Sequence, residues 1–228
     1  MIEVELPSLE YRDLPLAGTD GVRGDDEPGR EPLLGRVQVG GPHLRRLRAR
    51  DLAADPEVSR YADRTRYEYY LMYLGVSFPA HGSPRLKAAQ VAVALRSVPD
   101  AIAPAALSMR PLSDGDQVSV RRTASLGPKL TLLDAVDAEA GSIEVAQTRH
   151  RTEVFLRAVG LAGASPRWEF TETAGRKLDG AFPLLMVIQA GRGTDLSVTG
   201  TVSAQAKGNI PWRYRGDLPG PLEFGGTP

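Results

Sequence analysis

The chain has 228 residues, of which 42% are hydrophobic and 25% charged, a composition that is ordinary for a globular domain and excludes a wholly disordered polypeptide. Its 28 basic residues equal its 28 acidic residues, so no net charge draws it to nucleic acid or to an anionic membrane. Cysteine is absent, which excludes disulfides, thiolate nucleophiles and cysteine metal sites.

The N-terminal residues predict a short strand followed by a long loop. Ile2, Val4 and Leu6 alternate with glutamates up to Pro7, and the sequence from there to Pro42 is rich in Gly, Pro and Asp. This N-terminal segment, 1–42, lacks the basic and apolar regions of a secretion signal. No apolar run in the chain approaches the roughly 20 residues that span a bilayer. We therefore expect a cytoplasmic protein with no membrane partner.

Residues 43–64 are the most helical part of the sequence. Leu44 and Leu47 are three residues apart, and Asp55-Pro56-Glu57 is typical of an N-cap followed by proline in the first helical turn. We expect one or two short helices here, at the start of a domain that covers 43–207.

The rest of that domain predicts an antiparallel β-sandwich of about eight to ten strands. Residues 195–206 alternate apolar with hydroxyl or amide side chains, which is typical of a strand with one buried face. The residues GRGTD, at 191–195, favour a hairpin between the last two strands. Further strands separated by Gly, Pro, Asp and Ser clusters are expected at 65–78, 86–95, 105–109, 117–126, 129–133, 153–159, 167–171 and 181–189.

The C-terminal tail, 208–228, carries the candidate partner-binding residues. It is rich in Pro and Gly yet contains aromatic residues, and Trp, Tyr and Arg supply much of the binding energy at protein interfaces. One interpretation is that the aromatic residues pack on the domain's own sheet, and the other is that they contact another protein or subunit. The candidate contact residues are Trp212, Arg213, Tyr214, Arg215 and Phe224.

The sequence nominates no catalytic residue, no metal site and no cofactor. The three histidines have no spacing that would mark a zinc site or a Ser-His-acid triad. We therefore favour a non-catalytic binding or assembly module, with a protein partner or a homo-oligomer. The alternative is a cofactor-free hydrolase or sugar-modifying enzyme that uses carboxylates such as Glu169, Glu172 and Asp179 as acid and base in a sandwich cleft.

Two further features bear on these alternatives. The run LRRLRAR, at 44–50, could meet phosphates, but nearby acidic residues partly neutralise it, so nucleic-acid binding ranks last. Trp168 and Phe170 share one face of a predicted strand, which favours a place in the hydrophobic core over a sugar-stacking surface.

Overall fold

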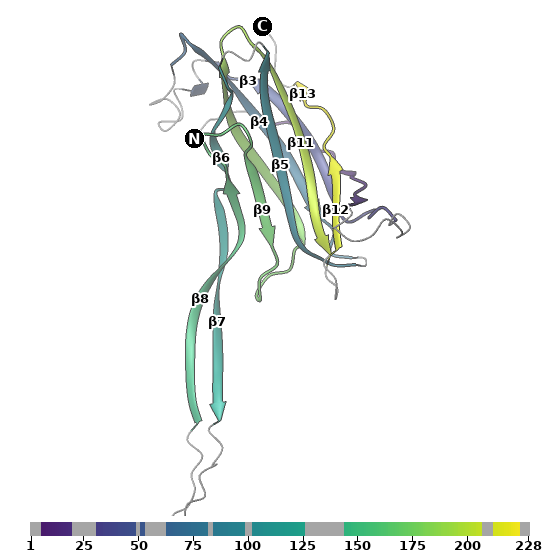
Figure 1. Ribbon diagram of the computed structural model, residues 1–228, viewed down its shortest axis with the longest axis vertical. Coiled ribbons are helices and arrows are strands. Elements are labelled where there is room, and N and C mark those ends of the chain that lie inside the picture. The colour runs from purple at the N-terminus through teal and green to yellow at the C-terminus, as the bar shows by residue number, and fades with distance from the viewer. Residues whose placement is uncertain are drawn as a thin grey trace, which may run out of the picture.

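The computed structural model contains two facing β-sheets and a long hairpin that projects from them (Figure 1). It describes residues 6–19, 31–48, 51–52, 63–81, 84–98, 102–125, 144–206 and 212–223. For 116–125, 144–151 and Trp212 it describes the backbone alone. Within that part of the chain there are thirteen strands, ten of which have five or more residues.

One sheet has six strands, with β4 (Tyr67–Phe78) and β10 (Gly180–Gly191) at its centre. These two strands are antiparallel and pair along their whole length. The order across the sheet is β1 (Arg12–Asp13), β3 (Gln38–Arg46), β4, β10 and β6 (Ala105–Arg110), and β13 (Leu222–Glu223) runs parallel to β3.

The other sheet has seven strands, and all of its neighbouring pairs are antiparallel. The longest pairing at its centre joins β11 (Asp195–Ala206) to β5 (Leu86–Val98). The order is β2 (Ala17–Gly18), β12 (Trp212–Asp217), β11, β5, β9 (Arg167–Thr171), β8 (Glu144–Val159) and β7 (Ser113–Ser125).

The inward faces of the two sheets enclose one hydrophobic core. Trp168 and Phe170 on β9 are buried, as predicted, and the Phe170 ring packs against Phe78, Phe155 and Phe182 at centroid distances of 5.3, 6.3 and 5.3 Å. The period of two along β11 also holds, because its apolar residues face the core while its hydroxyl and amide side chains face outward. The predicted antiparallel β-sandwich is confirmed.

The predicted bounds of two strands agree residue by residue, since 167–171 is β9 and 195–206 is β11. The predicted hairpin at 191–195 is wrong. The turn there joins β10 to β11, which lie in different sheets, β10 beside β4 and β6, and β11 beside β5 and β12. A short Gly-containing turn suits a hairpin or a sheet-to-sheet corner equally well, and long-range pairing decides between them.

The helices expected at 43–64 are replaced in part by a strand. Residues 43–46 belong to β3, where Leu44 pairs with Met72 of β4, so the local helical spacing is overridden by the sheet. Only Asp51 and Leu52 are helical among the described residues of this segment, and the predicted cap at 55–57 lies outside them. The predicted strand at 129–133 lies outside the described residues, and so does the predicted strand at 1–6 except for Leu6.

Segments on both sides of the predicted sandwich also contribute strands. The N-terminal segment supplies β1 and β2, and the C-terminal tail supplies β12 and β13. Gly75 of β4 marks where the N-terminal segment lies across the outer face of the six-stranded sheet, since an added Cβ would come within 2.6 Å of both Leu9 and Tyr11.

Candidate assembly surface

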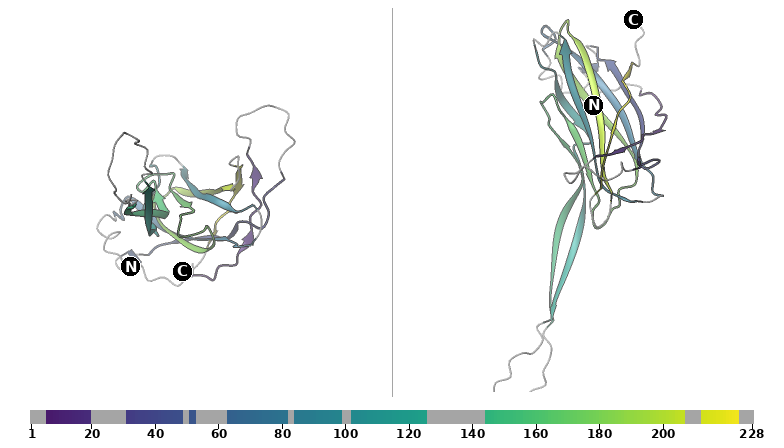
Figure 2. Two further views of the ribbon diagram at one scale, coloured as in Figure 1. Left: turned by 90° about the horizontal axis from the view of Figure 1, so that it is seen from below. Right: turned by 45° about the vertical axis from the view of Figure 1, so that its right-hand side comes forward.

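The most distinctive element of the fold is the hairpin formed by β7 and β8, which extends away from the sandwich in Figure 1 and in the right-hand view of Figure 2. Its register runs from Ser113 opposite Arg157 to Ser125 opposite Glu144. β8 also pairs with β9, but only from Leu156 to Val159. We call residues 115–125 and 144–154 the ribbon. These two halves pair with each other and with no other described strand.

The ribbon is long enough to form an extended contact. At a rise of about 3.3 Å per residue, each half spans roughly 35 Å beyond the sandwich. Each half also has an outer edge along which backbone N–H and C=O groups meet no described strand. Neither β7 nor β8 contains a proline, the residue that would remove an edge donor.

The base of the ribbon is fixed to the sandwich through Arg176. Its guanidinium lies 4.0 Å from the ring centroid of Phe155 on β8, and its Nη1 donates to Asp114 Oδ2 on β7 at 2.6 Å. The backbone N–H of Ala174 donates to the Glu153 carboxylate at 2.9 Å. One loop therefore contacts both β7 and β8 where they leave the body.

Apolar side chains are exposed beside this base. Leu112, just before β7, is 59% exposed, and Val154 of β8 is 47% exposed. Aliphatic side chains exposed next to a pair of open strand edges are suited to burial against another protein.

The predicted tail residues are divided between the core and the outer face of the seven-stranded sheet. Tyr214 is 8% exposed and belongs to the core, whereas Arg213 and Arg215 are exposed on the opposite face of β12. The backbone of Trp212 starts β12, its side chain is outside the description, and Phe224 lies outside the described residues. The partner-binding role of these five residues stays a prediction.

The basic run 44–50 is partly neutralised, as its sequence suggested. Arg45 pairs with Asp51 at 3.2 Å, and Arg46 pairs with Glu68 on the neighbouring strand. Asp51 also accepts a hydrogen bond from the backbone N–H of Arg48. These contacts pair Arg45 and Arg46 with carboxylates, which reduces the cationic charge that the run offers to phosphates.

Of the carboxylates considered for catalysis, Glu169 has the clearest environment. Its carboxylate accepts hydrogen bonds from Arg167 Nε at 2.7 Å and from Arg157 Nε at 2.6 Å. The hydrogen bond from Arg167, followed by that from Arg157, lowers the pKa of Glu169 despite the opposing effect of partial burial. Glu169 therefore stays ionised at neutral pH, and it is poorly suited to donate a proton as a general acid.

The described residues hold neither a cluster of metal-ligating side chains nor a membrane-spanning helix. They contain no group of three or more His, Cys, Asp or Glu side chains arranged to hold a metal ion. No helix in the described part of the chain has the length and apolar character needed to cross a membrane.

Sequence reasoning predicted parts of the two ribbon strands but missed their length. The polar stretch from Glu144 to Thr152 carries few β-branched or aromatic residues, so only 153–159 was predicted as a strand there. Val118 and Val120 alternate within the strand that was predicted at 117–126, and the polar stretch offered no comparable apolar alternation.

No model of a protein family matches this chain, and no curated protein matches it. Among solved structures, the membrane-inserted form of the Clostridium perfringens NetB toxin is 11% identical, with 91% of each chain covered and a TM-score of 0.29. Clostridium perfringens delta-toxin is 9% identical, with 87% of this chain and 92% of that chain covered and a TM-score of 0.26. TM-scores this low do not establish a shared fold.

Proposed function

We propose that this protein is a non-catalytic assembly module whose copies associate through the edges of the ribbon. The observation that supports this most directly is the pair of open strand edges, one on β7 and one on β8, beyond the last pairing with β9. The mode of association is strand addition, in which the backbone groups of one edge pair with those of another chain.

The energetics of a two-stranded hairpin favour such a partner. An isolated pair of strands is marginally stable in water, and a third strand or a packed layer is needed for independent stability. No described strand pairs with the outer edge of either half of the ribbon. Association would supply the missing strand to each edge. It would also remove the exposed apolar surface of Leu112 and Val154, at the base, from contact with water.

A second copy of this chain is the partner that fits both edges at once. β7 and β8 run in opposite directions, so the β7 edge of one copy meets the β8 edge of an identically oriented copy in antiparallel fashion. This contact is head-to-tail, because two different edges meet, and repeating it builds a ring or a filament. A protein of another kind would have to supply a strand of matching length.

The strand register shows where the ribbon can be removed and the hairpin closed again. Asp116 pairs with Glu153, so the residues between them can be replaced by Asn-Gly, the preferred two-residue hairpin turn. Sedimentation velocity across the micromolar range should show concentration-dependent oligomers of the full chain and a monomer of the excised variant. Circular dichroism of the excised variant should retain the sheet signal, because all the core residues of the described part of the chain lie outside 117–152.

A second variant separates the ribbon edges from the segment that connects them. Ser125 pairs with Glu144, so joining these two residues by Asn-Gly removes 126–143 and keeps both ribbon strands. Association should persist in this control. A full chain that stays monomeric at all concentrations would refute the proposal, as would a loss of association in the control that equals the loss in the excised variant.

A further inference from the structure

A groove lies on the outer face of the seven-stranded sheet, and its lining follows the strand register. Gln90 of β5 pairs with Glu169 of β9 on one side and with Ser203 of β11 on the other, and Ser203 pairs with Arg215 of β12. These four residues form one row across the sheet. A second row, two residues along each strand, contains Thr171, Ala88, Gln205 and Arg213.

The hollow results from a small residue at the centre of the second row. Ala88 lies between the longer Gln205 and Thr171, and with the neighbouring side chains it leaves a groove of about 430 Å³. This volume lies within the range of small-molecule sites, which is roughly 300 to 1,000 Å³. The groove spans four strands, so its length from β12 to β9 is about 14 Å at the usual strand spacing.

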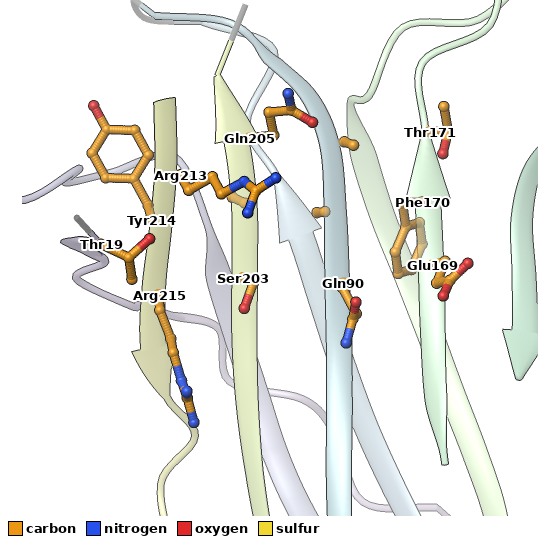
Figure 3. A pocket seen from close by; sticks show the side chains of 13 residues that line it. Thr19, Gln90, Glu169, Phe170, Thr171, Ser203, Gln205, Arg213, Tyr214 and Arg215 are labelled. Atoms are coloured by element: carbon orange, nitrogen blue, oxygen red, sulfur yellow. The ribbon is translucent and has the colours of Figure 1, made fainter. Parts of the chain in front are cut away.

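The two ends of the groove differ in charge. Arg213 and Arg215 are exposed at one end, and no ion pair with a described acidic residue is formed by either. Figure 3 shows Arg213 extending over β11 near Gln205, with Thr19 beside β12. Glu169 lies at the other end and already has both Arg157 and Arg167 as partners. Among the described groove residues, the cations that have no described acidic partner are therefore Arg213 and Arg215 on β12.

The floor between these ends consists of side chains that both donate and accept hydrogen bonds. Gln90 and Gln205 present amides, and Ser203 and Thr171 present hydroxyls. Sugar hydroxyls also donate and accept, so such a floor matches a polyhydroxylated ligand better than a purely anionic or purely apolar one. Guanidinium groups bind carboxylate, sulfate or phosphate in bidentate fashion.

We propose that this groove binds an acidic mono- or disaccharide, with the anionic group at Arg213 and Arg215 and the hydroxyls along Gln90, Ser203 and Gln205. The site is separate from the ribbon edges and does not depend on assembly. Ligand binding here would give the module a second recognition surface, on the face of the sheet that points away from the core.

Calorimetric titration of the full chain tests this with four sugars. Glucose 6-phosphate, glucuronate and N-acetylglucosamine 6-sulfate present the three anionic groups, and glucose is the neutral counterpart. At least one acidic sugar should bind about tenfold more tightly than glucose, and that preference should disappear in the double variant R213Q/R215Q. Inorganic phosphate and sulfate, titrated separately, measure binding of the anion alone.

Matched variants define the outcomes. R96Q removes an exposed arginine of β5 that is not part of the groove lining, so it should leave affinity unchanged. Q90A/S203A removes floor contacts and should weaken the acidic sugar severalfold without affecting inorganic anions. The proposal is overturned if no acidic sugar is preferred over glucose, if the preference survives R213Q/R215Q, or if inorganic anions bind as tightly as the sugar.

Discussion

The sandwich body and the ribbon are built from the same kind of strand, yet their stability has different sources. In the body, strands are held on one face by a continuous core that includes Trp168 and the Phe78, Phe155, Phe170 and Phe182 rings. In the ribbon, each described strand has a single neighbour. Packing in the core therefore stabilises the body. The ribbon is stabilised, among the described residues, by backbone hydrogen bonds between its two strands.

This difference supports the proposal that the ribbon is the part of the molecule that associates. A region whose backbone groups and apolar neighbours are already satisfied gains little from another protein. A region with open edges gains hydrogen bonds and burial at once. The body supplies a rigid base, and the loop around Arg176 fixes the ribbon to it through contacts with Asp114 and Phe155.

The largest expected effect tests the body. Trp168 is fully buried, so W168A should lower the free energy of unfolding by about 3 to 5 kcal/mol through lost burial and a residual cavity. Urea unfolding followed by circular dichroism measures the change. W168F is the matched control and should cost about 1 kcal/mol, because the indole Nε1 has no hydrogen-bond partner to lose among the described residues. Equal losses in both variants would contradict the cavity explanation.

An intermediate effect is expected at Arg36, which fastens the connection between β4 and β5 to the body. Arg36 is 5% exposed and donates to the carbonyls of Pro79 at 3.1 Å, Pro84 at 3.2 Å and His81. R36M retains much of the apolar stem but leaves these carbonyls without their donor, and should cost about 2 to 3 kcal/mol.

Thermal melts of R36M and of R96M separate this role from a general effect of removing an arginine. Arg96 is exposed on the outer face of β5, so R96M should stay within about 0.5 kcal/mol of the natural sequence. If R36M melts with R96M, the three carbonyls are satisfied in another way and Arg36 does not anchor the turn.

The sequence was sufficient for the body and insufficient for the ribbon, for a physical reason. Burial imposes a period of two, so β9 and β11 could be predicted to the residue and Trp168 placed in the core. The ribbon projects away from the sandwich and its half from Glu144 is polar, so no such period marked that half as a strand. Strand pairing between distant segments was equally invisible, and for that reason 191–195 was predicted as a hairpin instead of a connection between sheets.

The candidate groove illustrates the same limit. Arg213 and Arg215 were singled out from the sequence as contact residues, but the tail offered no indication that they would share one face of the sheet with Gln90 and Glu169. Those residues are more than 40 positions away in the chain. Their meeting depends on the order of β12, β11, β5 and β9, which local patterns do not encode.

The smallest expected effect lies at the junction of body and ribbon. R176Q removes a cation stacked on Phe155 and the ion pair with Asp114, and should lower the free energy of unfolding by about 1 to 2 kcal/mol. Its sharper signature is local: hydrogen exchange of amides at 113–116 and 153–156 should accelerate, while exchange in β5 and β11 stays slow.

D114N isolates the ion pair from the stacking. The Asp114 side chain is 47% exposed, so this pair alone should contribute at most about 1 kcal/mol, and D114N should accelerate exchange less than R176Q does. If both variants accelerate exchange equally, the stacking on Phe155 contributes nothing. If neither does, the base of the ribbon is as firmly held by its pairing with β9 as any strand of the body, and the contrast between the two regions begins farther out, beyond Val154.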